Sequence, residues 1–436
     1  MISEIQRKKQ TNMGKQKPLI KWPGGKSGEI AQIRRFVPAF DRYVEPFVGG
    51  GALLFYLEPE KAIINDNSEY LMEFYTLTKQ QDPAFRAALE WYCSAFQGLI
   101  DVCDSSYARI YAMYRLYQVA MGEKLDIADA GIHEGTCIRI ALEALEAAGA
   151  GKAEQKGERT GNGEPETPAD VRLAPDALLF EQDRYLRFIC ESVGDKILRT
   201  IRNDRKHPMS EADIRENLIT GFAGGFYLYF RDVFNRIAAG TLEATPAQRC
   251  ANFFFVREYC YGSMFRYNAK GEFNIPYGGK SYNRKDFRSK VERIFAPETA
   301  ALLSGVQLTC MDFEEMMEAA ELTGKDFVFL DPPYDTEFSD YEGKDFTRED
   351  HRRLAQALER TKAKFLLVIK NTEFIYSLYE GKFPMYAFEN RYVYNVRSRN
   401  ERRAEHLIIT NCEMTADCQA IADGDIAAGC RNADSE

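Results

Sequence analysis

Short apolar runs recur near both ends of the chain, and most of them lead into an acidic, glycine-rich or proline-containing turn. Runs of this length are typical of buried β-strands. Helical periodicity follows two of them, from Ala52 to about Leu57 and from about Arg348 to Thr361. Strands that alternate with helices indicate a mainly parallel sheet, so the pattern predicts an α/β fold. The predicted strands are the run that begins at Tyr43 and residues 62–66, 306–313, 326–330 and 365–369, with a closing hairpin from 392–396 and 405–410.

The run at 326–330 is followed by Asp331-Pro332-Pro333-Tyr334. Two prolines cannot continue a central strand, because each lacks an N–H group. The predicted strand therefore ends at Asp331, and the chain turns at the carboxyl end of the strand. In open α/β sheets, ligands bind at this edge.

The same turn offers a carboxylate, a backbone carbonyl and an aromatic ring, a set that suits a planar amine. Asp331 and the Pro332 carbonyl can accept the two amine hydrogens, while Tyr334 stacks on the ring that carries the amine. The competing interpretation is an ordinary proline-rich turn after a strand.

A second candidate site lies near the N-terminus. Gly49, Gly50 and Gly51 follow the first predicted strand, and Asp66 ends the next one. A glycine loop after one strand and an acid after the next is the arrangement that binds an adenosine group. A nucleotide phosphate loop ending at 25–27 is disfavoured, because Ile20 stands where that motif requires glycine.

The middle of the chain has a different pattern of apolar and polar residues. Residues 90–217 are helix-rich, apart from 149–170, which contain no apolar residue larger than alanine and predict a flexible linker or loop. Residues 224–236 and 251–261 are aromatic-rich, which is most simply explained by core packing.

Composition limits the class of protein. The fractions of hydrophobic (45%) and charged (28%) residues are ordinary for a globular protein, and no apolar run approaches the ~18 residues of a membrane span. The N-terminal 17 residues lack an apolar signal region, and the ten cysteines form no C-x-x-C pair, so we expect free thiols and a cytoplasmic protein without a membrane partner. Four scattered histidines predict no metal site.

Charge is unevenly distributed. The net charge is −9, but residues 1–26, 257–293 and 391–403 carry +6, +5 and +4, whereas the segment after Thr410 carries −5. Local basic stretches matter more to a polyanion than the sum over the chain, although each can also be a solvated face.

Taken in order, these motifs resemble the Dam-type (alpha-group) DNA adenine-N6 methyltransferases. The stretch from Arg266 to Pro276 also resembles the hairpin by which those enzymes read DNA. The ordered motifs are Lys21-Trp22-Pro23-Gly24-Gly25-Lys26, Glu45-Pro46-Phe47-Val48-Gly49-Gly50-Gly51, Asn65-Asp66-Asn67 and Asp331-Pro332-Pro333-Tyr334.

The resemblance implies a Rossmann-like methyltransferase sheet that binds S-adenosylmethionine, with a helical target-recognition region and a β-hairpin. The implied activity is methyl transfer to the N6 amine of an adenine flipped out of duplex DNA. The implied catalytic residues are Asp331, Pro332 and Tyr334. The implied cofactor-binding residues are Trp22, Lys26, Phe47, Gly49, Asp66, Asp312 and Asp331.

For DNA, the resemblance implies Tyr261 as an inserting aromatic and Arg266 as the reader of a guanine. Nearby Lys270, Arg284 and Lys285 are residue types suited to phosphates. Gly262 and Lys280 depart from the family pattern and leave a GATC target in doubt. The implied DNA-binding residues are Tyr261, Arg266, Asn268, Lys270 and Pro276.

The sequence thus predicts a basic tail (1–17), a catalytic domain (18–90 and 295–410), a helical insertion of unknown role (91–220), a target-recognition region (221–294) and an acidic disordered tail (411–436). A cognate restriction enzyme is a possible partner. Two alternatives stay open: a methyltransferase acting on RNA or a protein amide, and a non-catalytic DNA-binding module.

Overall fold

The computed structural model describes residues 16–123, 131–150, 178–335, 340–341, 344–391 and 403–412. The chain divides into two compact units, which we call the sheet unit (1–76 and 301–436) and the helical unit (77–300). The predicted insertion and target-recognition region belong together to the helical unit. The N-terminal and acidic tails, apart from residues 16–17 and 411–412, and residues 151–170 of the predicted linker lie outside the described residues.

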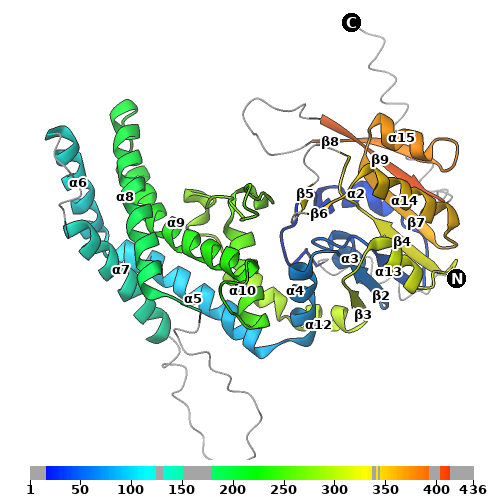
Figure 1. Cartoon of the computed structure of the whole chain (residues 1–436), viewed down its shortest axis with the longest axis horizontal. Coiled ribbons are helices and arrows are strands. Elements are labelled where there is room, and N and C mark those ends of the chain that lie inside the picture. The colour runs from blue at the N-terminus through cyan, green and yellow to red at the C-terminus, as the bar shows by residue number, and fades with distance from the viewer. Residues whose placement is uncertain are drawn as a thin grey trace, which may run out of the picture. The chain divides into compact units, whose positions relative to one another are not determined.

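The sheet unit contains a seven-stranded sheet in the order β3-β2-β1-β4-β7-β9-β8 (Figure 1). Neighbours from β3 to β7 are parallel, whereas β9 is antiparallel to both β7 and β8. This mostly parallel sheet with flanking helices confirms the predicted α/β methyltransferase-like fold. The strands are β1 (Arg42–Glu45), β2 (Ala62–Asn65), β3 (Val306–Thr309), β4 (Asp326–Leu330), β7 (Lys364–Lys370), β8 (Met385–Arg391) and β9 (Arg403–Thr410).

The strand order fixes where a ligand can bind. β1 lies between β2 and β4, with Val44 in register with both Ile63 and Val328. The chain therefore enters the middle of the sheet at β1, leaves to one side through β2 and later returns on the other side through β4. Such a reversal opens a crevice at the carboxyl ends of the strands.

The core of the sheet unit is apolar and continuous. Every residue of β4 is buried, and β7 is buried from Phe365 to Ile369. Side chains from α13 (Phe313–Ala319), α14 (Arg348–Arg360) and α15 (Glu373–Tyr379) pack against these strands. Burial of each large apolar side chain contributes about 1.5–3 kcal/mol to the stability of the fold. The packing of these helices on the strands therefore holds the strands in place.

The closing hairpin is confirmed only in its second strand, since residues 392–396 lie outside the described ranges. β9 pairs instead with β8, which ends at Arg391. The other helices and two-stranded elements of the sheet unit are η1 (Lys26–Gly28), α2 (Ile30–Ile33), η2 (Arg34–Phe36), α3 (Ala52–Leu57), β5 (Asp340–Tyr341) and β6 (Lys344–Asp345).

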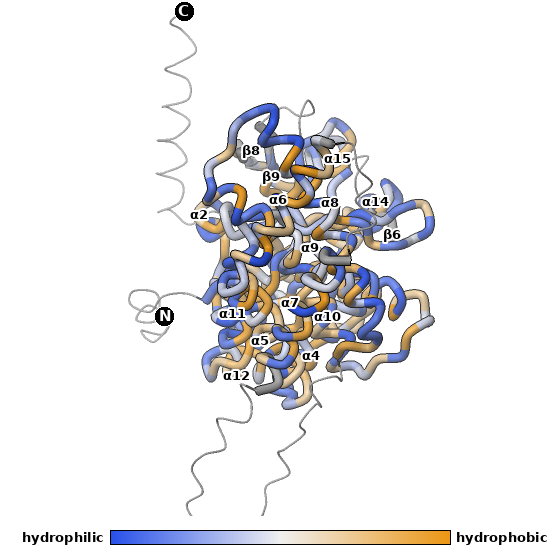
Figure 2. Tube along the Cα trace, turned by 90° about the vertical axis from the view of Figure 1, so that its left-hand side faces the viewer, coloured by the Kyte–Doolittle hydropathy of each residue, from blue (hydrophilic) through white to orange (hydrophobic). Residues whose placement is uncertain are grey.

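The helical unit confirms the predicted helix-rich segment. α4 (Glu69–Gln80) and α12 (Pro297–Ser304) cross the boundary between the two units. Figure 2 shows hydrophobic and hydrophilic residues interspersed in this unit. The buried residues of α5 alternate with exposed ones, as expected for an amphipathic helix, whereas α10 is buried at every residue from Cys250 to Tyr259. The helices within the unit are α5 (Pro83–Ser105), α6 (Tyr107–Glu123), α7 (Gly131–Ala150), α8 (Gln182–Lys206), α9 (Glu211–Ala238), α10 (Pro246–Tyr259), η5 (Tyr261–Ser263), η6 (Lys280–Tyr282) and α11 (Arg288–Ile294).

Aromatic side chains form much of the core of this unit, as predicted for residues 224–236 and 251–261. Phe226, Phe230 and Phe255 are buried, and the rings of Tyr92 and Phe255 stack with centroids 4.7 Å apart. Tyr261 is the exception, with 46% of its surface exposed. None of the helices in the described ranges is both long enough and apolar enough to cross a bilayer.

Candidate active site

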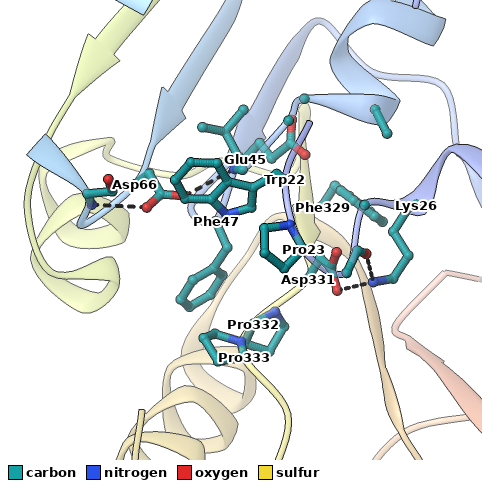
Figure 3. Close-up of a pocket in the computed structure, with 18 of the residues that line it drawn as sticks. Trp22, Pro23, Lys26, Glu45, Phe47, Asp66, Phe329, Asp331, Pro332 and Pro333 are labelled. Atoms are coloured by element: carbon teal, nitrogen blue, oxygen red, sulfur yellow. Dashed lines mark hydrogen bonds and ion pairs between the residues drawn. The ribbon is translucent and has the colours of Figure 1, made fainter. Parts of the chain in front are cut away.

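The predicted ligand residues converge because three parallel neighbours end at one edge. β1 runs into the glycine loop, β2 into Asp66 and β4 into Asp331. Figure 3 shows these side chains around one cavity. The structure places eight of the nine predicted catalytic and cofactor-binding residues there, namely Trp22, Lys26, Phe47, Gly49, Asp66, Asp331, Pro332 and Tyr334.

Asp331 is paired with Lys26 across the cavity. Lys26 Nζ lies 2.5 Å from Asp331 Oδ1 and also donates to the Gly24 carbonyl at 2.8 Å. Burial raises the pKa of Asp331 to about 6, although the positive charge of Lys26 opposes that shift. Asp331 is therefore a carboxylate whose ionisation depends on its lysine partner.

The ring of Tyr334 is supported by a buried polar pair. It meets the ring of His406 edge to face, with centroids 5.4 Å apart, and Lys26 Nζ lies 5.2 Å from its centre. His406 is fully buried, and its Nδ1 lies 3.0 Å from Glu29 Oε2. These contacts fix the orientation of Tyr334 at the wall of the cavity.

The glycine loop requires glycine at position 49 for two reasons. Its φ is +47°, which most side chains avoid, and an added Cβ would lie 2.7 Å from Trp22 Cδ1. Its N–H donates to Asp66 Oδ2 at 3.0 Å, while Tyr75 Oη donates to its carbonyl at 3.0 Å. The loop is thereby tied to β2 and α4 and stays close to the indole of Trp22.

Glu45 is a cavity residue that the motif analysis did not single out. It is 2% exposed, and its Oε2 atom has no hydrogen-bond partner in the part of the chain that the structure describes. Burial raises its pKa well above the ordinary value, and the carboxylates of Asp331 and Asp66 raise it further. An acid at the end of a strand is too common to stand out, but its place directly before the glycine loop is the signal that could have identified it.

Asp312 is the predicted cofactor residue that does not line the cavity. Its carboxylate caps α13 by accepting from the Glu314 N–H at 2.9 Å, and it accepts from Arg353 Nη2 at 2.6 Å. Its neighbour Phe313 packs on Phe47, a cavity residue, with ring centroids 5.4 Å apart. Asp312 is therefore linked to the cavity through packing in this structure.

The predicted DNA-reading residues lie in the helical unit, on a segment that we call the 260–277 loop. Two isolated antiparallel bridges, Cys260 to Tyr277 and Tyr267 to Phe273, close it in place of full strands. Asn268 Oδ1 accepts from the N–H groups of Lys270 and Glu272 at 2.9 and 3.0 Å and so builds the tip of the loop. Tyr261, Arg266, Lys270 and Pro276 are exposed along it.

The start of this loop is anchored by a buried arginine. Arg257, 1% exposed, donates from Nη1 to the Met264 carbonyl at 2.8 Å. Its guanidinium lies 3.6 Å from the centre of the Phe265 ring. Arg266 follows directly, and its Nε donates to Asn274 Oδ1 at 2.9 Å across the loop. The exposed face of the loop is therefore supported from within the unit.

Two predicted phosphate contacts have intramolecular partners instead. Lys285 Nζ lies 2.5 Å from Oε2 of Glu258, a fully buried carboxylate. Arg284 pairs with Asp104 and Glu216 at 2.9 and 2.8 Å. These pairs join the residues after the loop to α10, α5 and α9, which favours a structural role for both cations.

A parallel sheet with this strand order, a glycine loop and an Asp-Pro-Pro-Tyr turn in one cavity defines the methyltransferase class of α/β proteins. Over residues 22–98 and 199–396 the chain matches the model of the D12 class N6 adenine-specific DNA methyltransferases, and it belongs to that family.

Individual relatives agree with the family. The chain is 35% identical over 165 residues to the Type II methyltransferase M.CviBI of Paramecium bursaria Chlorella virus NC1A, covering 37% of this chain and 60% of that protein. It is 26% identical over 388 residues to the Type II methyltransferase M.MjaIII of Methanocaldococcus jannaschii, covering 84% and 88%. It is 30% identical over 146 residues to a DNA adenine methylase of Haemophilus influenzae, covering 31% and 48%. Two of these three matches thus span less than two thirds of the relative.

Proposed function

We propose that this protein transfers a methyl group from S-adenosylmethionine to the N6 amine of an adenine that has left the DNA duplex, at a defined sequence. The observation that carries the proposal is the single cavity that joins the Asp331 turn to the glycine loop and Asp66. One part of the cavity suits a planar amine, and the other suits an adenosine.

The charges in the cavity fit this cofactor. Glu45, Asp66 and Asp331 all line it, and Glu45 Oε2 has no hydrogen-bond partner among the described residues. S-Adenosylmethionine carries a sulfonium group, an amino-acid group with an ammonium, and two ribose hydroxyls. Carboxylates bind such groups, and a bound cation would oppose the raised pKa of Glu45. When bound, it supplies a methyl group on positively charged sulfur. Trp22 and Phe47 offer apolar surface for the rest of the molecule.

The turn would activate the amine. The lone pair of an exocyclic base amine is delocalised into the ring, so the amine is a poor nucleophile. Asp331 and the Pro332 carbonyl, by accepting its two hydrogens, would draw the lone pair out of conjugation, and Tyr334 would stack on the base. Because alignment of the reacting groups can lower a barrier by ~7–11 kcal/mol, the chain needs to supply little else.

The state of Asp331 predicts a pH dependence. When Asp331 is ionised, both of its oxygens are available to accept an amine hydrogen. Because its pKa is raised to about 6, kcat/KM should fall as the pH drops below about 6. Lys26→Gln removes a charge that lowers this pKa, and the acid limb should therefore move to higher pH. Profiles of kcat/KM between about pH 5 and 8.5 check this. Lys325→Gln, an exposed surface change, is the control. If the acid limb of kcat/KM lies at the same pH in Lys26→Gln and in the wild type, the proposed link between Lys26 and Asp331 is wrong.

The 260–277 loop predicts how sequence is read. Arg266→Ala should reduce discrimination at one base pair by about 1–3 kcal/mol, because a bidentate arginine–guanine contact is lost. Lys270→Ala, at the exposed tip of the same loop, should weaken all sequences alike. The measurement is the methylation rate on a set of sites that differ by one base pair. Equal losses on every site for Arg266→Ala would make the loop a positioning element without base reading.

Two further proposals concern context. Because two relatives carry the name Type II methyltransferase, a cognate restriction enzyme is a proposed partner. Cys93, Cys103, Cys137 and Cys190 form no disulfide among the described residues, which supports a reducing, cytoplasmic location.

A further inference from the structure

Helix α8 of the insertion carries basic residues that have no evident structural role in the described part of the fold. Arg184 pairs with Asp232 of α9, and Arg205 and Lys206 lie in the last turn, where cations offset the helix dipole. Lys196, Arg199 and Arg202 have neither explanation. They follow one another at intervals of three residues and therefore share one flank of the helix.

Lys280 joins this flank from the recognition side of the helical unit. The stem of Lys196 lies against α9 at Gly221, where an added Cβ would be 3.2 Å from Lys196 Cβ. Lys280 is bonded to Asp213 of α9 at 2.9 Å. Burial lowers the pKa of Lys196, and the positive charges of Arg199 and Lys280 lower it further. Arg199 lies one helical turn after Lys196, and Arg202 one turn after Arg199, so neighbouring cations lie close enough to repel one another.

Several arginines elsewhere in the described part of this unit have a carboxylate partner, as in the pairs Arg109–Glu143 and Arg215–Asp104. Within the same described part, no ion pair joins Lys196, Arg199 or Arg202 to a carboxylate. Asp195 lies on the same flank, but it is exposed and forms no ion pair with Arg199. Like charges held together cost folding free energy, and an external polyanion would offset that cost.

We propose that Lys196, Arg199 and Arg202 form a phosphate-binding surface for DNA that flanks the target site, beside Lys280, whose charge Asp213 already offsets. The inference rests on the proposed function, because it takes duplex DNA as the substrate. Lys280 comes three residues after the 260–277 loop, so the surface continues the DNA-reading segment onto the insertion. This gives the insertion helix a role: it extends the contact with the backbone beyond the bases that are read.

The test is DNA binding by the full-length protein as a function of salt. The variant combines Lys196→Gln, Arg199→Gln and Arg202→Gln. The matched control combines Arg115→Gln, Arg139→Gln and Arg187→Gln, exposed arginines on α6, α7 and another flank of α8. Each phosphate contact contributes about 0.9 to the slope of log K against log salt, so the variant should lose roughly 2–3 from the slope on a long duplex. The control should keep the wild-type slope.

Three further readouts separate this surface from the reading of bases. The variant should match the wild type on a duplex trimmed closely around the site. It should also keep wild-type discrimination between sites and a wild-type rate at saturating DNA. If the variant keeps the wild-type slope on the long duplex although the wild-type protein methylates DNA, the proposed phosphate-binding surface is wrong. An acidic protein would then be the partner to test. A wild type that neither binds nor methylates duplex DNA would instead overturn the proposed function.

Discussion

Asp331→Ala should lower the rate of methyl transfer by about a hundred- to a thousandfold, the effect typical of removing one group that stabilises a transition state. In the proposed mechanism the carboxylate is the charged acceptor for the amine, and no other side chain of the turn can replace it. Lys26 would also lose its partner at 2.5 Å. Because Asp331 follows a fully buried strand and precedes two prolines, the fold should persist.

Trp22 provides the means to separate chemistry from cofactor binding. It lines the cavity, whereas the other tryptophan, Trp91, is buried in the helical unit. Quenching of Trp22 fluorescence by S-adenosylmethionine would report binding in Asp331→Ala. Asp335→Ala is the matched control, since that carboxylate lies on the same segment but pairs with Arg348 at 3.1 Å. Turnover above a few per cent of wild type in Asp331→Ala, on duplex DNA, would refute the proposed mechanism.

Gly225→Ala should destabilise the helical unit by about 2 kcal/mol, although alanine is the better helix former by ~1 kcal/mol. An added Cβ would lie 2.7 Å from Ile189 Cα and 2.9 Å from the Phe188 carbonyl oxygen. Both are backbone atoms of α8, so the two helices would have to separate. Overpacking of this kind typically costs about 1–3 kcal/mol beyond any propensity gain.

Gly224→Ala is the matched control for this change. It adds the same methyl group one residue earlier, where the nearest atom is the Ser192 hydroxyl at 3.1 Å, a side-chain group that can move. This variant should be as stable as the wild type or slightly more stable. Urea unfolding, followed by Trp91 fluorescence in a Trp22→Phe background, measures both. Equal stability of the two alanine variants would show that α8 and α9 do not pack as closely as described.

Local sequence signals were sufficient for six of the seven described strands of the sheet and for the turns at the centre of the site, whereas β8 was not predicted. A strand that ends at two prolines and a glycine turn after a strand are set by backbone chemistry within a few residues. Adjacency of parallel strands then brings their carboxyl ends together. From the residues alone, the Asp331 turn and the pair Gly49 and Asp66 were two candidate sites. The resemblance to the methyltransferases joined them, and the adjacency of the strands explains why they meet.

Contacts with partners that are distant in the sequence could not be predicted from local sequence signals. Lys285 has the residue type of a phosphate contact, but its partner is Glu258 on α10, buried at 0% exposure. Asp312 matches a cofactor position, yet Arg353, 41 residues away, binds its carboxylate. Glu45 becomes notable only once Asp66 and Asp331 are known to lie beside it. In each case, the electrostatic partner is distant in the sequence and comes to light only in the folded chain.

The most direct test of the account is to incubate the wild-type protein and Asp331→Ala with duplex DNA and S-adenosylmethionine labelled in the methyl group, and to identify the labelled nucleoside by mass spectrometry. The account predicts N6-methyladenine from the wild type, at one sequence context, and nearly none from Asp331→Ala. Label that stays out of DNA, enters cytosine, or enters adenine equally with both proteins would contradict it.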